Sequence, residues 1–185
     1  TGANVAVTDE DAIDLGASTV SGTYGITAGG AITDSGALAI TGATTISASG
    51  QAVTLDDASN NFVGAVGITG ANVSVRDAGA IDLGASTVSG TYLVTAAGAV
   101  TDSGALAITG ATTISASGQA VTLDNTSNNF TGAVGITGAN VAVVDAGAID
   151  LGASTVSGTY AVTATSGGDI TDSGVLAITG ASTLT

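Results

Sequence analysis

Hydrophobic and polar residues alternate in short runs along this chain. In "AIDL" at Ala80–Leu83, Ile81 and Leu83 fall on one side of an extended backbone and Asp82 on the other. The run "AVTL" at Ala52–Leu55 has the same form. No stretch of useful length has the period of a helix. The pattern therefore predicts β-strands of about four or five residues.

Turn sequences separate these runs. They are "TGA", "SGT", "DSG" and "DAG", in which Gly permits a positive φ and Asp or Ser bonds the local backbone. Strands this short bury little surface alone, so we expect successive turns to stack on one another. Parallel strands joined by crossovers wind right-handed. The predicted fold is all-β, a right-handed parallel β-helix (β-solenoid).

The chain is a tandem repeat. The first two units, residues 1–68 and 69–136, differ at 11 positions, and an incomplete third unit occupies 137–185 with a two-residue insertion near Thr165–Asp169. One decamer, "LGASTVSGTY", recurs in each unit, at Leu15–Tyr24, Leu83–Tyr92 and Leu151–Tyr160. Near-identical tandem units predict one continuous solenoid over residues 1–185.

The strand spacing predicts about three coils per 68-residue repeat. Coils of about 22, 22 and 24 residues fit it, and an unequal division into about 28, 26 and 14 residues stays open. At about 4.8 Å per stacked coil, one unit would rise about 14 Å and the whole chain about 40 Å. Because the third unit is incomplete, we expect this chain to be a window on a longer protein whose repeat continues beyond both ends.

The alternation assigns an aliphatic core. The residues expected to be buried are Ile13, Leu15, Leu38, Ile40, Val53, Leu55, Ile81, Leu83, Leu106, Ile108, Val121 and Leu123. Phe62 and Phe130 are expected to plug the core. Tyr24, Tyr92 and Tyr160 are expected to cover coil corners with their hydroxyls in water, although stacking on sugars stays open. Neighbouring coils could be bonded by Asn60, Asn61, Asn128 and Asn129.

Differences between units are expected on the surface. Thr8 in the first unit becomes Arg76 in the second, and Glu10 becomes Ala78. Asp57 becomes Asn125 in the same way, whereas the inward pair Ile32 and Val100 stays aliphatic. We therefore expect Arg76 to be exposed.

Composition narrows the class of protein. One Lys or Arg stands against 15 Asp and Glu, giving a net charge of −14, which repels nucleic acid. The 44% hydrophobic content opposes disorder. No apolar run approaches the roughly 18 residues of a membrane helix, so membrane insertion is not expected. The absence of Cys removes disulfides and thiolate metal sites.

Chemistry-bearing groups are few. There is no His or Lys to act as the base of a nucleophilic site, so we expect no enzyme and assign no catalytic, cofactor-binding or metal-ligating residue. Acidic residues recur one unit apart, which places equivalents about three coils from each other, and they are expected to be solvated rather than to hold a cation. These positions are Asp14, Asp82 and Asp150, then Asp34, Asp102 and Asp172, then Asp56 and Asp124. The "DED" at Asp9–Asp11 becomes "DAG" in both later units, which indicates variable surface.

The run "TGANVSVRDAGAIDLGASTVSGTYLVTAAGAVTDSGALAITGATTISASG" at residues 69–118 resembles the repeat arrays of filamentous-haemagglutinin-like exoproteins, which are giant bacterial surface proteins and adhesins. The likeness covers the whole chain. It implies a right-handed parallel β-helix shaft that is extracellular or on the cell surface. Nothing matches that family's secretion domain or a receptor-binding head, so the export route and the target stay open.

These observations together favour a structural shaft of an extracellular fibre or surface adhesin. Its expected partner is itself, through end-to-end continuation, stacking or lateral bundling, and a cell-surface or glycan target stays open. One alternative is an ice-binding solenoid, which needs Thr on every coil, whereas Gly and Ala interrupt the pattern. The other is a polysaccharide-cleaving β-helix enzyme, which the missing bases disfavour.

Overall fold

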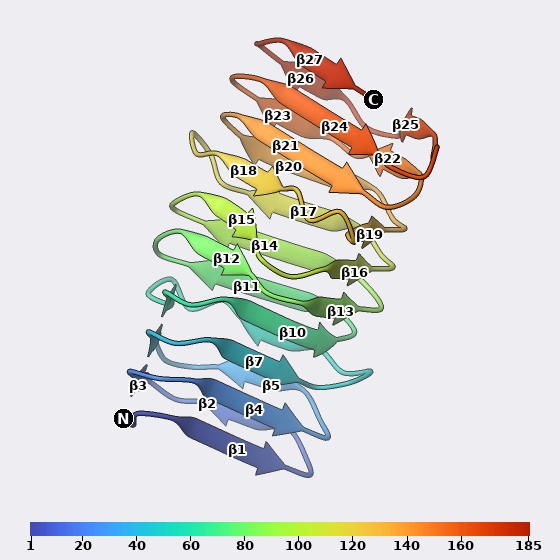
Figure 1. The fold of residues 1–185 in the computed structure, drawn as a ribbon. Coiled ribbons are helices and arrows are strands. Elements are labelled where there is room, and N and C mark those ends of the chain that lie inside the picture. Colours follow the sequence, from blue (N-terminus) through green and yellow to red (C-terminus); the bar gives the residue numbers. More distant parts are fainter.

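A computed structural model describes residues 1–185 as 27 β-strands with no helix. Every strand pairing is parallel, and the strands fall into sheets of 13, 11 and 3 strands. In Figure 1 the nearer strands run from left to right and the fainter strands behind them return, while the chain climbs from the N-terminus to the C-terminus. This is a right-handed parallel β-solenoid, as the alternating pattern predicted.

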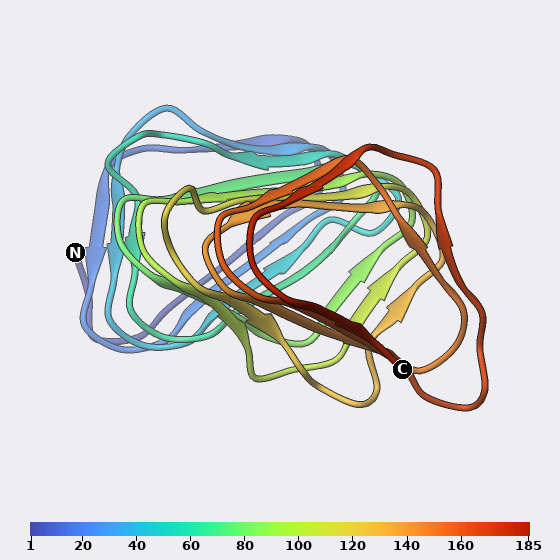
Figure 2. The same cartoon turned by 90° about the horizontal axis from the view of Figure 1, so that it is seen from above.

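Each turn of the solenoid is flattened, with two broad sides (Figure 2). One side is a single long strand. In the first repeat these are β1 (Val5–Asp9), β4 (Tyr24–Ala28), β7 (Thr44–Ser47) and β10 (Val66–Gly70). In the second they are β11 (Val73–Asp77), β14 (Tyr92–Ala96), β17 (Thr112–Ser115) and β20 (Val134–Gly138). In the third they are β21 (Val141–Asp145), β24 (Tyr160–Ala164) and the shorter β27 (Ser182–Leu184).

The other side is a pair of short strands in line. The first repeat has β2 (Ile13–Leu15) with β3 (Ser18–Val20), β5 (Ile32–Asp34) with β6 (Leu38–Ile40), and β8 (Val53–Leu55) with β9 (Asn61–Phe62). The second has β12 (Ile81–Leu83) with β13 (Ser86–Val88), β15 (Val100–Asp102) with β16 (Leu106–Ile108), and β18 (Val121–Leu123) with β19 (Asn129–Phe130). The third has β22 (Ile149–Leu151) with β23 (Ser154–Val156), and β25 (Ile170–Asp172) with β26 (Leu176–Ile178).

Strand register gives the length of each turn. Val5 pairs with Tyr24, Tyr24 with Thr44, Thr44 with Val66 and Val66 with Leu83, so these turns advance by 19, 20, 22 and 17 residues. Coil lengths of 22, 22 and 24 were therefore wrong, because loops of different length close the turns. The largest sheet runs through ten strands from β1 to β27, which makes nine turns between them.

One repeat does not close on a whole turn. It has four long strands and three pairs of short strands, so it forms seven half-turns. At the junction with the next repeat two long strands, β10 and β11, follow each other with only Ala71 and Asn72 between them. As a result β1 lies in the 13-stranded sheet, its equivalent β11 in the 11-stranded sheet, and β21 again in the 13-stranded sheet. The expected three or so coils per repeat are in fact three and a half, and each repeat is turned by half a revolution from the last.

The core runs the length of the solenoid. Forty buried hydrophobic residues form one cluster, which includes all of the expected core residues except Ile13. Ile13 is half-buried because its strand β2 pairs only with β5, so no turn covers its other side. Phe62 and Phe130 are each 1% exposed and fill the core as expected.

The tyrosines lie inside the core, not at corners in contact with water. Tyr24, Tyr92 and Tyr160 are 3%, 0% and 1% exposed, and the hydroxyls of Tyr92 and Tyr160 have no hydrogen-bond partner. The expected corner position was therefore wrong, and stacking on a sugar is ruled out by the same burial. Each tyrosine opens a long strand at an inward position, where its ring contributes more buried apolar surface than an aliphatic side chain.

Candidate functional site

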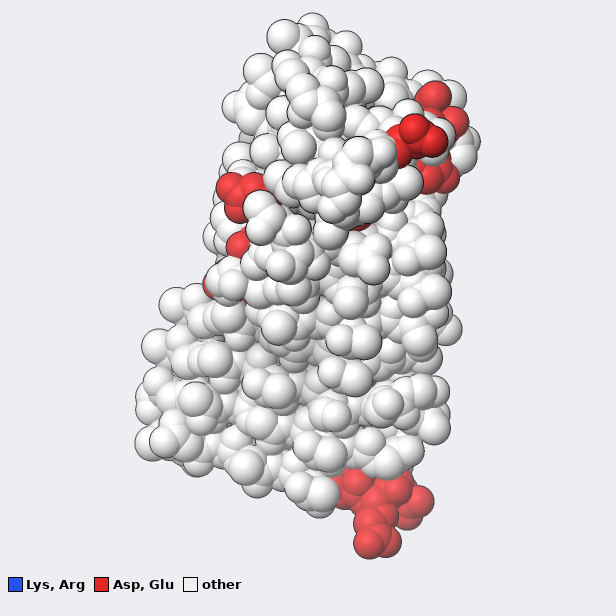
Figure 3. All heavy atoms as spheres, turned by 45° about the vertical axis from the view of Figure 1, so that its right-hand side comes forward, with Lys and Arg blue, Asp and Glu red and all other residues white.

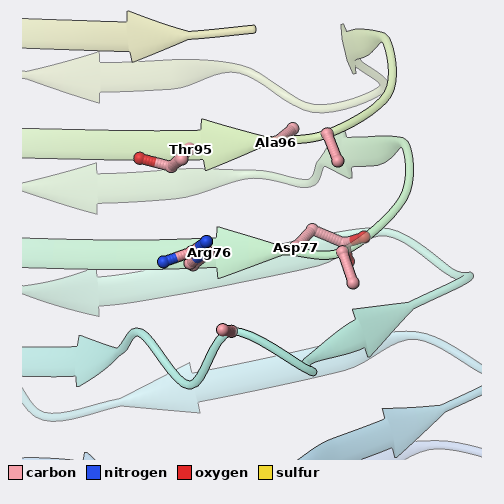
Figure 4. A pocket seen from close by; sticks show the side chains of 7 residues that line it. Arg76, Asp77, Thr95 and Ala96 are labelled. Atoms are coloured by element: carbon pink, nitrogen blue, oxygen red, sulfur yellow. The ribbon is translucent and has the colours of Figure 1, made fainter.

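A shallow pocket of about 310 Å³ lies at the end of β11, lined by Ala58, Arg76, Asp77, Ala78, Thr95, Ala96 and Ala97. Figure 4 shows Arg76 beside Thr95 of the next strand, with Asp77 at the strand end. Arg76 is exposed, as expected. Its equivalents, Thr8 and Val144, carry no charge, so the pocket's chemistry is not repeated along the solenoid.

Asp77 closes an interrupted sheet. Because the half-turn at the repeat junction moves the next strand to the other side, β9 has no strand above it and pairs only with β6. The carboxylate of Asp77 accepts a hydrogen bond from the Phe62 N–H at 2.7 Å and from its own turn, at Gly79 N–H, at 2.6 Å. Asp145 does the same for Phe130 and Gly147, both at 2.6 Å. The aspartate of "DAG" is therefore a buried cap, which the sequence comparison had placed on the variable surface.

The burial that this cap requires is electrostatically costly. Burial raises the pKa of Asp77 above its ordinary value, and the two backbone N–H donors oppose that rise. In the first repeat Asp9 is only half-buried and bonds the nearby Asp11 N–H. The difference follows from position, since no β9-like strand lies beneath Asp9 in this chain.

A second set of side-chain hydrogen bonds, which we call the asparagine clip, joins neighbouring turns. The Asn60 carboxamide donates to Asp34 at 2.6 Å and accepts from the Leu38 N–H at 2.8 Å. Asn128 repeats both bonds with Asp102 and Leu106. Both asparagines are fully buried, which confirms that they bond neighbouring coils, whereas Asn61 and Asn129 are exposed and make no such bond.

The carboxylate of Asp102 is half-buried in this clip. Burial raises its pKa, the Asn128 amide and the N–H groups of Asp124 and Asn125 lower it, and the Asp124 charge raises it again. Asp34 and Asp102 are therefore structural acceptors, and the expectation from the sequence that they are solvated groups was wrong for them. The described chain contains no group of three or more His, Cys, Asp or Glu that could hold a metal ion.

Outward hydroxyls form columns along the long strands, and each column continues onto a short strand, β13 or β23. Thr8, Thr27, Ser47, Thr69 and Thr87 are consecutive register partners on the 13-stranded sheet, one in each of five turns. On the opposite sheet the equivalent column contains Arg76, Thr95, Ser115, Thr137 and Thr155. Strands in a sheet lie about 4.8 Å apart, so the first column is a regular row of five hydroxyls and the second a row of four that begins beside Arg76. We call the first of these the hydroxyl column.

Residues 2–69, 70–137 and 138–185 each match a family described as repeats of unknown function (DUF5649). The chain belongs to this repeat family. No curated protein and no solved structure matches the chain. The DUF5649 boundaries fall inside the long strands β10 and β20, at the repeat junction where the solenoid makes its half-turn.

The DUF5649 repeat separates neutral from acidic surface. The outward positions of the first repeat's long strands are Ala, Gly, Ser and Thr, whereas its short-strand side carries Asp14, Asp34 and Asp56. In the second repeat the two sides are exchanged by the half-turn, so Asp82 and Asp102 lie on the 13-stranded sheet. Figure 3 shows the result, with acidic side chains gathered at a few places and a broad uncharged area between them.

No catalytic constellation emerges from the DUF5649 fold. The only cationic side chain makes no ion pair, and the buried carboxylates of Asp77 and Asp145 are held by backbone N–H donors from the neighbouring turn and from their own corners. No helix of the chain could span a membrane, since there is none. The candidate functional feature is therefore a surface, namely the hydroxyl column and the neutral long-strand face of the first repeat that carries most of it.

Proposed function

We propose that the chain is a structural shaft of an extracellular fibre or surface adhesin and that it performs no catalysis. The observation that carries the proposal is the unbroken core: one cluster of forty buried residues extends from Leu15 to Val162 and passes through both repeat junctions. A rod of this kind supplies length and stiffness. The resemblance of the repeat to filamentous-haemagglutinin-like arrays supports the placement outside the cell.

The junction explains how such a shaft grows. Across it, Val66 pairs with Leu83 and Thr69 with Thr87, and the same contacts recur between Val134 and Leu151 and between Thr137 and Thr155. An added unit therefore reproduces every contact of the previous one. In solenoids stability is approximately a sum of repeat and neighbour terms, so length is added without redesign.

The partner proposed is a second copy of the shaft. Uncharged rows of small and hydroxyl side chains cover the long-strand side, and the net charge of −14 is carried mainly by the short-strand sides and corners. Two shafts could meet over the neutral long-strand face of one repeat, and the half-turn places a short-strand face with its carboxylates on the same side in the next repeat. A cell-surface or glycan target would need a further part of the protein.

The test is a length series. A chain with residues 69–136 inserted once more should be longer by about 17 Å, since three and a half turns rise by about 4.8 Å each. Small-angle scattering of both chains measures the maximum dimension directly. An unchanged maximum dimension, with the extra unit folded beside the first, would overturn the shaft.

Ice binding is a second candidate because of the hydroxyl column. The expectation that Gly and Ala interrupt the threonines holds for the neighbouring column of Ala6, Gly25, Thr45 and Gly67, but the hydroxyl column itself is unbroken over five turns. An ice-recrystallisation assay tests it, with Thr27→Lys and Thr69→Lys as variants that disrupt the row. Inhibition by the natural chain and its loss in the variants would favour ice binding, and equal behaviour of all three chains would exclude it.

A polysaccharide-cleaving activity is the third class. The proposal predicts no release of reducing ends from acidic or neutral polysaccharides, because Asp77, the one carboxylate that lines the pocket with Arg76, is engaged by two backbone N–H donors. Measurable cleavage that Arg76→Ala abolishes would replace the structural proposal with an enzymatic one.

A further inference from the structure

Three Asn-x-Ser/Thr sequences occur in this chain, and all lie in the second repeat. They are Asn72-Val73-Ser74, Asn125-Thr126-Ser127 and Asn129-Phe130-Thr131. The first repeat has Asn4-Val5-Ala6, Asp57-Ala58-Ser59 and Asn61-Phe62-Val63 at the same places. Asn-x-Ser/Thr is the acceptor sequence for N-linked sugars, so single-residue differences between near-identical units create each potential site.

The structure distinguishes the three asparagines. The carboxamide oxygen of Asn72 accepts bonds from the Thr91 N–H at 3.0 Å and the Thr91 hydroxyl at 3.2 Å. That of Asn125 accepts the Ser127 N–H at 3.0 Å and is half-buried. The carboxamide of Asn129 is exposed and makes no hydrogen bond within the chain. Of the three, only Asn129 is exposed with a carboxamide that no hydrogen bond within the chain holds in one orientation, since Asn72 and Asn125 are each fixed through the carboxamide oxygen.

The surroundings of Asn129 are open. Its register partner on the turn below is Ala107, a small side chain, and β19 pairs with no strand above it. The sheet edge there is closed by the Asp145 carboxylate on the Phe130 N–H and not by a strand that would cover the neighbouring side chain. The Ala146 N–H also bonds the Asn128 carbonyl, so the turn after β21 lies above this break, and the Asn129 side chain is open to a transferase from the outward face of the sheet.

The acceptor geometry is also in place. Phe130 is buried at 1% exposure, and Asn129 and Thr131 on either side of it are exposed. Residues two apart in an extended strand point to the same side, so the carboxamide and the hydroxyl both face solvent. The buried ring anchors the segment in the extended conformation that presents them.

We propose that Asn129 is an acceptor for an N-linked sugar. Its Nδ2 forms a bond to the anomeric carbon of a sugar carried on a phosphate-activated donor. The bond between that carbon and the donor's phosphate oxygen breaks, the phosphate leaves with the electron pair, and one amide proton passes to a base of the transferase. The Thr131 hydroxyl is the recognition group that the first repeat lacks, because Val63 occupies its place.

Peptide mass spectrometry of the protein isolated from its natural source tests the site. We expect a hexose or N-acetylhexosamine mass on the peptide that contains Asn129 and none on the peptide that contains Asn61. Digestion needs a protease that cuts after Leu, Phe or Tyr, because the chain has a single Lys or Arg. An unmodified Asn129 would overturn the proposal, and equal occupancy of Asn72 would overturn the structural selection among the three.

The two repeats provide matched variants, produced in the same source. Thr131→Val gives the second unit the side chain that the first already carries at Val63, which is itself 65% exposed, so it should fold normally and lose the sugar. Val63→Thr should create a new modified site at Asn61. Persistence of the sugar in Thr131→Val, or no gain in Val63→Thr on a chain that is modified at Asn129, would each contradict recognition through this hydroxyl.

Discussion

Val5 and Val73 occupy equivalent positions in consecutive repeats, yet they lie in different sheets, on opposite broad sides of the solenoid. Val5 pairs with Tyr24 in the 13-stranded sheet, and Val73 pairs with Val53 and Tyr92 in the 11-stranded sheet. Val141, one repeat further on, returns to the first sheet. Every surface feature of a unit is therefore displayed alternately on the two sides, and the same side recurs every 136 residues.

The axial period of a long fibre follows from this half-turn. At about 4.8 Å per turn, we expect successive repeats to be spaced about 17 Å apart along the fibre. Because a given side recurs only in every second repeat, the period of one side should be about 34 Å. Electron micrographs of fibres provide the measurement through their power spectra. A period of about 14 Å, the value for three whole turns, would contradict the half-turn junction.

Leu106 is a stringent test of the core. Leu106 is completely buried, so Leu106→Asp should lower the free energy of unfolding by about 4 kcal/mol or more, because an unpaired charge would enter the core. The matched control is Leu93→Asp, at an outward position that is 40% exposed, where we expect less than about 1 kcal/mol. Urea denaturation followed by circular dichroism compares them, and similar losses in both variants would show that the side-chain facing is misassigned.

Asp145 tests the cap on the interrupted sheet. Asp145→Ala leaves the N–H groups of Phe130 and Gly147 without their acceptor, and we expect a loss of about 1–3 kcal/mol. Asp172→Ala, at an exposed aspartate, is the control and should change stability little. Hydrogen exchange adds a local readout, since the Phe130 amide should lose protection. Unchanged exchange at that amide would argue against the cap.

Stability should rise as the pH falls from neutral toward about 4. Burial raises the pKa of Asp77 and of Asp102 in the folded chain above the unfolded value, so the folded chain binds protons first. Their stabilising effect is complete below the unfolded pKa and is lost as the pH rises through the folded pKa. Urea midpoints at several pH values measure this. Asp102→Asn should flatten the dependence, and stability that falls on acidification to pH 4 would refute the sign.

Tyr92 carries a hydroxyl that the core does not need. Burial raises the pKa of Tyr92 strongly, and the hydroxyl has no hydrogen-bond partner, since the Ser86 hydroxyl donates to the Gly84 carbonyl instead. Tyr92→Phe should therefore be neutral within about 0.5 kcal/mol or stabilising, whereas Tyr92→Ala should cost about 3–5 kcal/mol because it leaves a cavity. Denaturation midpoints of both variants measure this, and a marked loss in Tyr92→Phe would reveal a bond made by the hydroxyl.

Local information was sufficient for the strands and their facing. Alternation in runs such as Ala80–Leu83 placed Ile81 and Leu83 inside and Asp82 outward, because neighbouring side chains of an extended backbone point to opposite sides. The near-identical tandem units predicted the solenoid. The differences between equivalent positions of the units predicted that Arg76 is exposed. These features depend on a few adjacent residues, which the sequence states directly.

Tertiary structure decided what depends on how turns stack. The half-turn arises because two long strands meet at Ala71 and Asn72, and neither residue signals by itself which sheet the next strand will join. The same shift leaves β9 and β19 without a strand above them, which turns Asp77 and Asp145 into buried caps, and it aligns Thr69 with Thr87 in one column. The sequence alone determined that this chain forms a solenoid. The register between turns, which loop lengths and core packing set, determined which residues lie in contact.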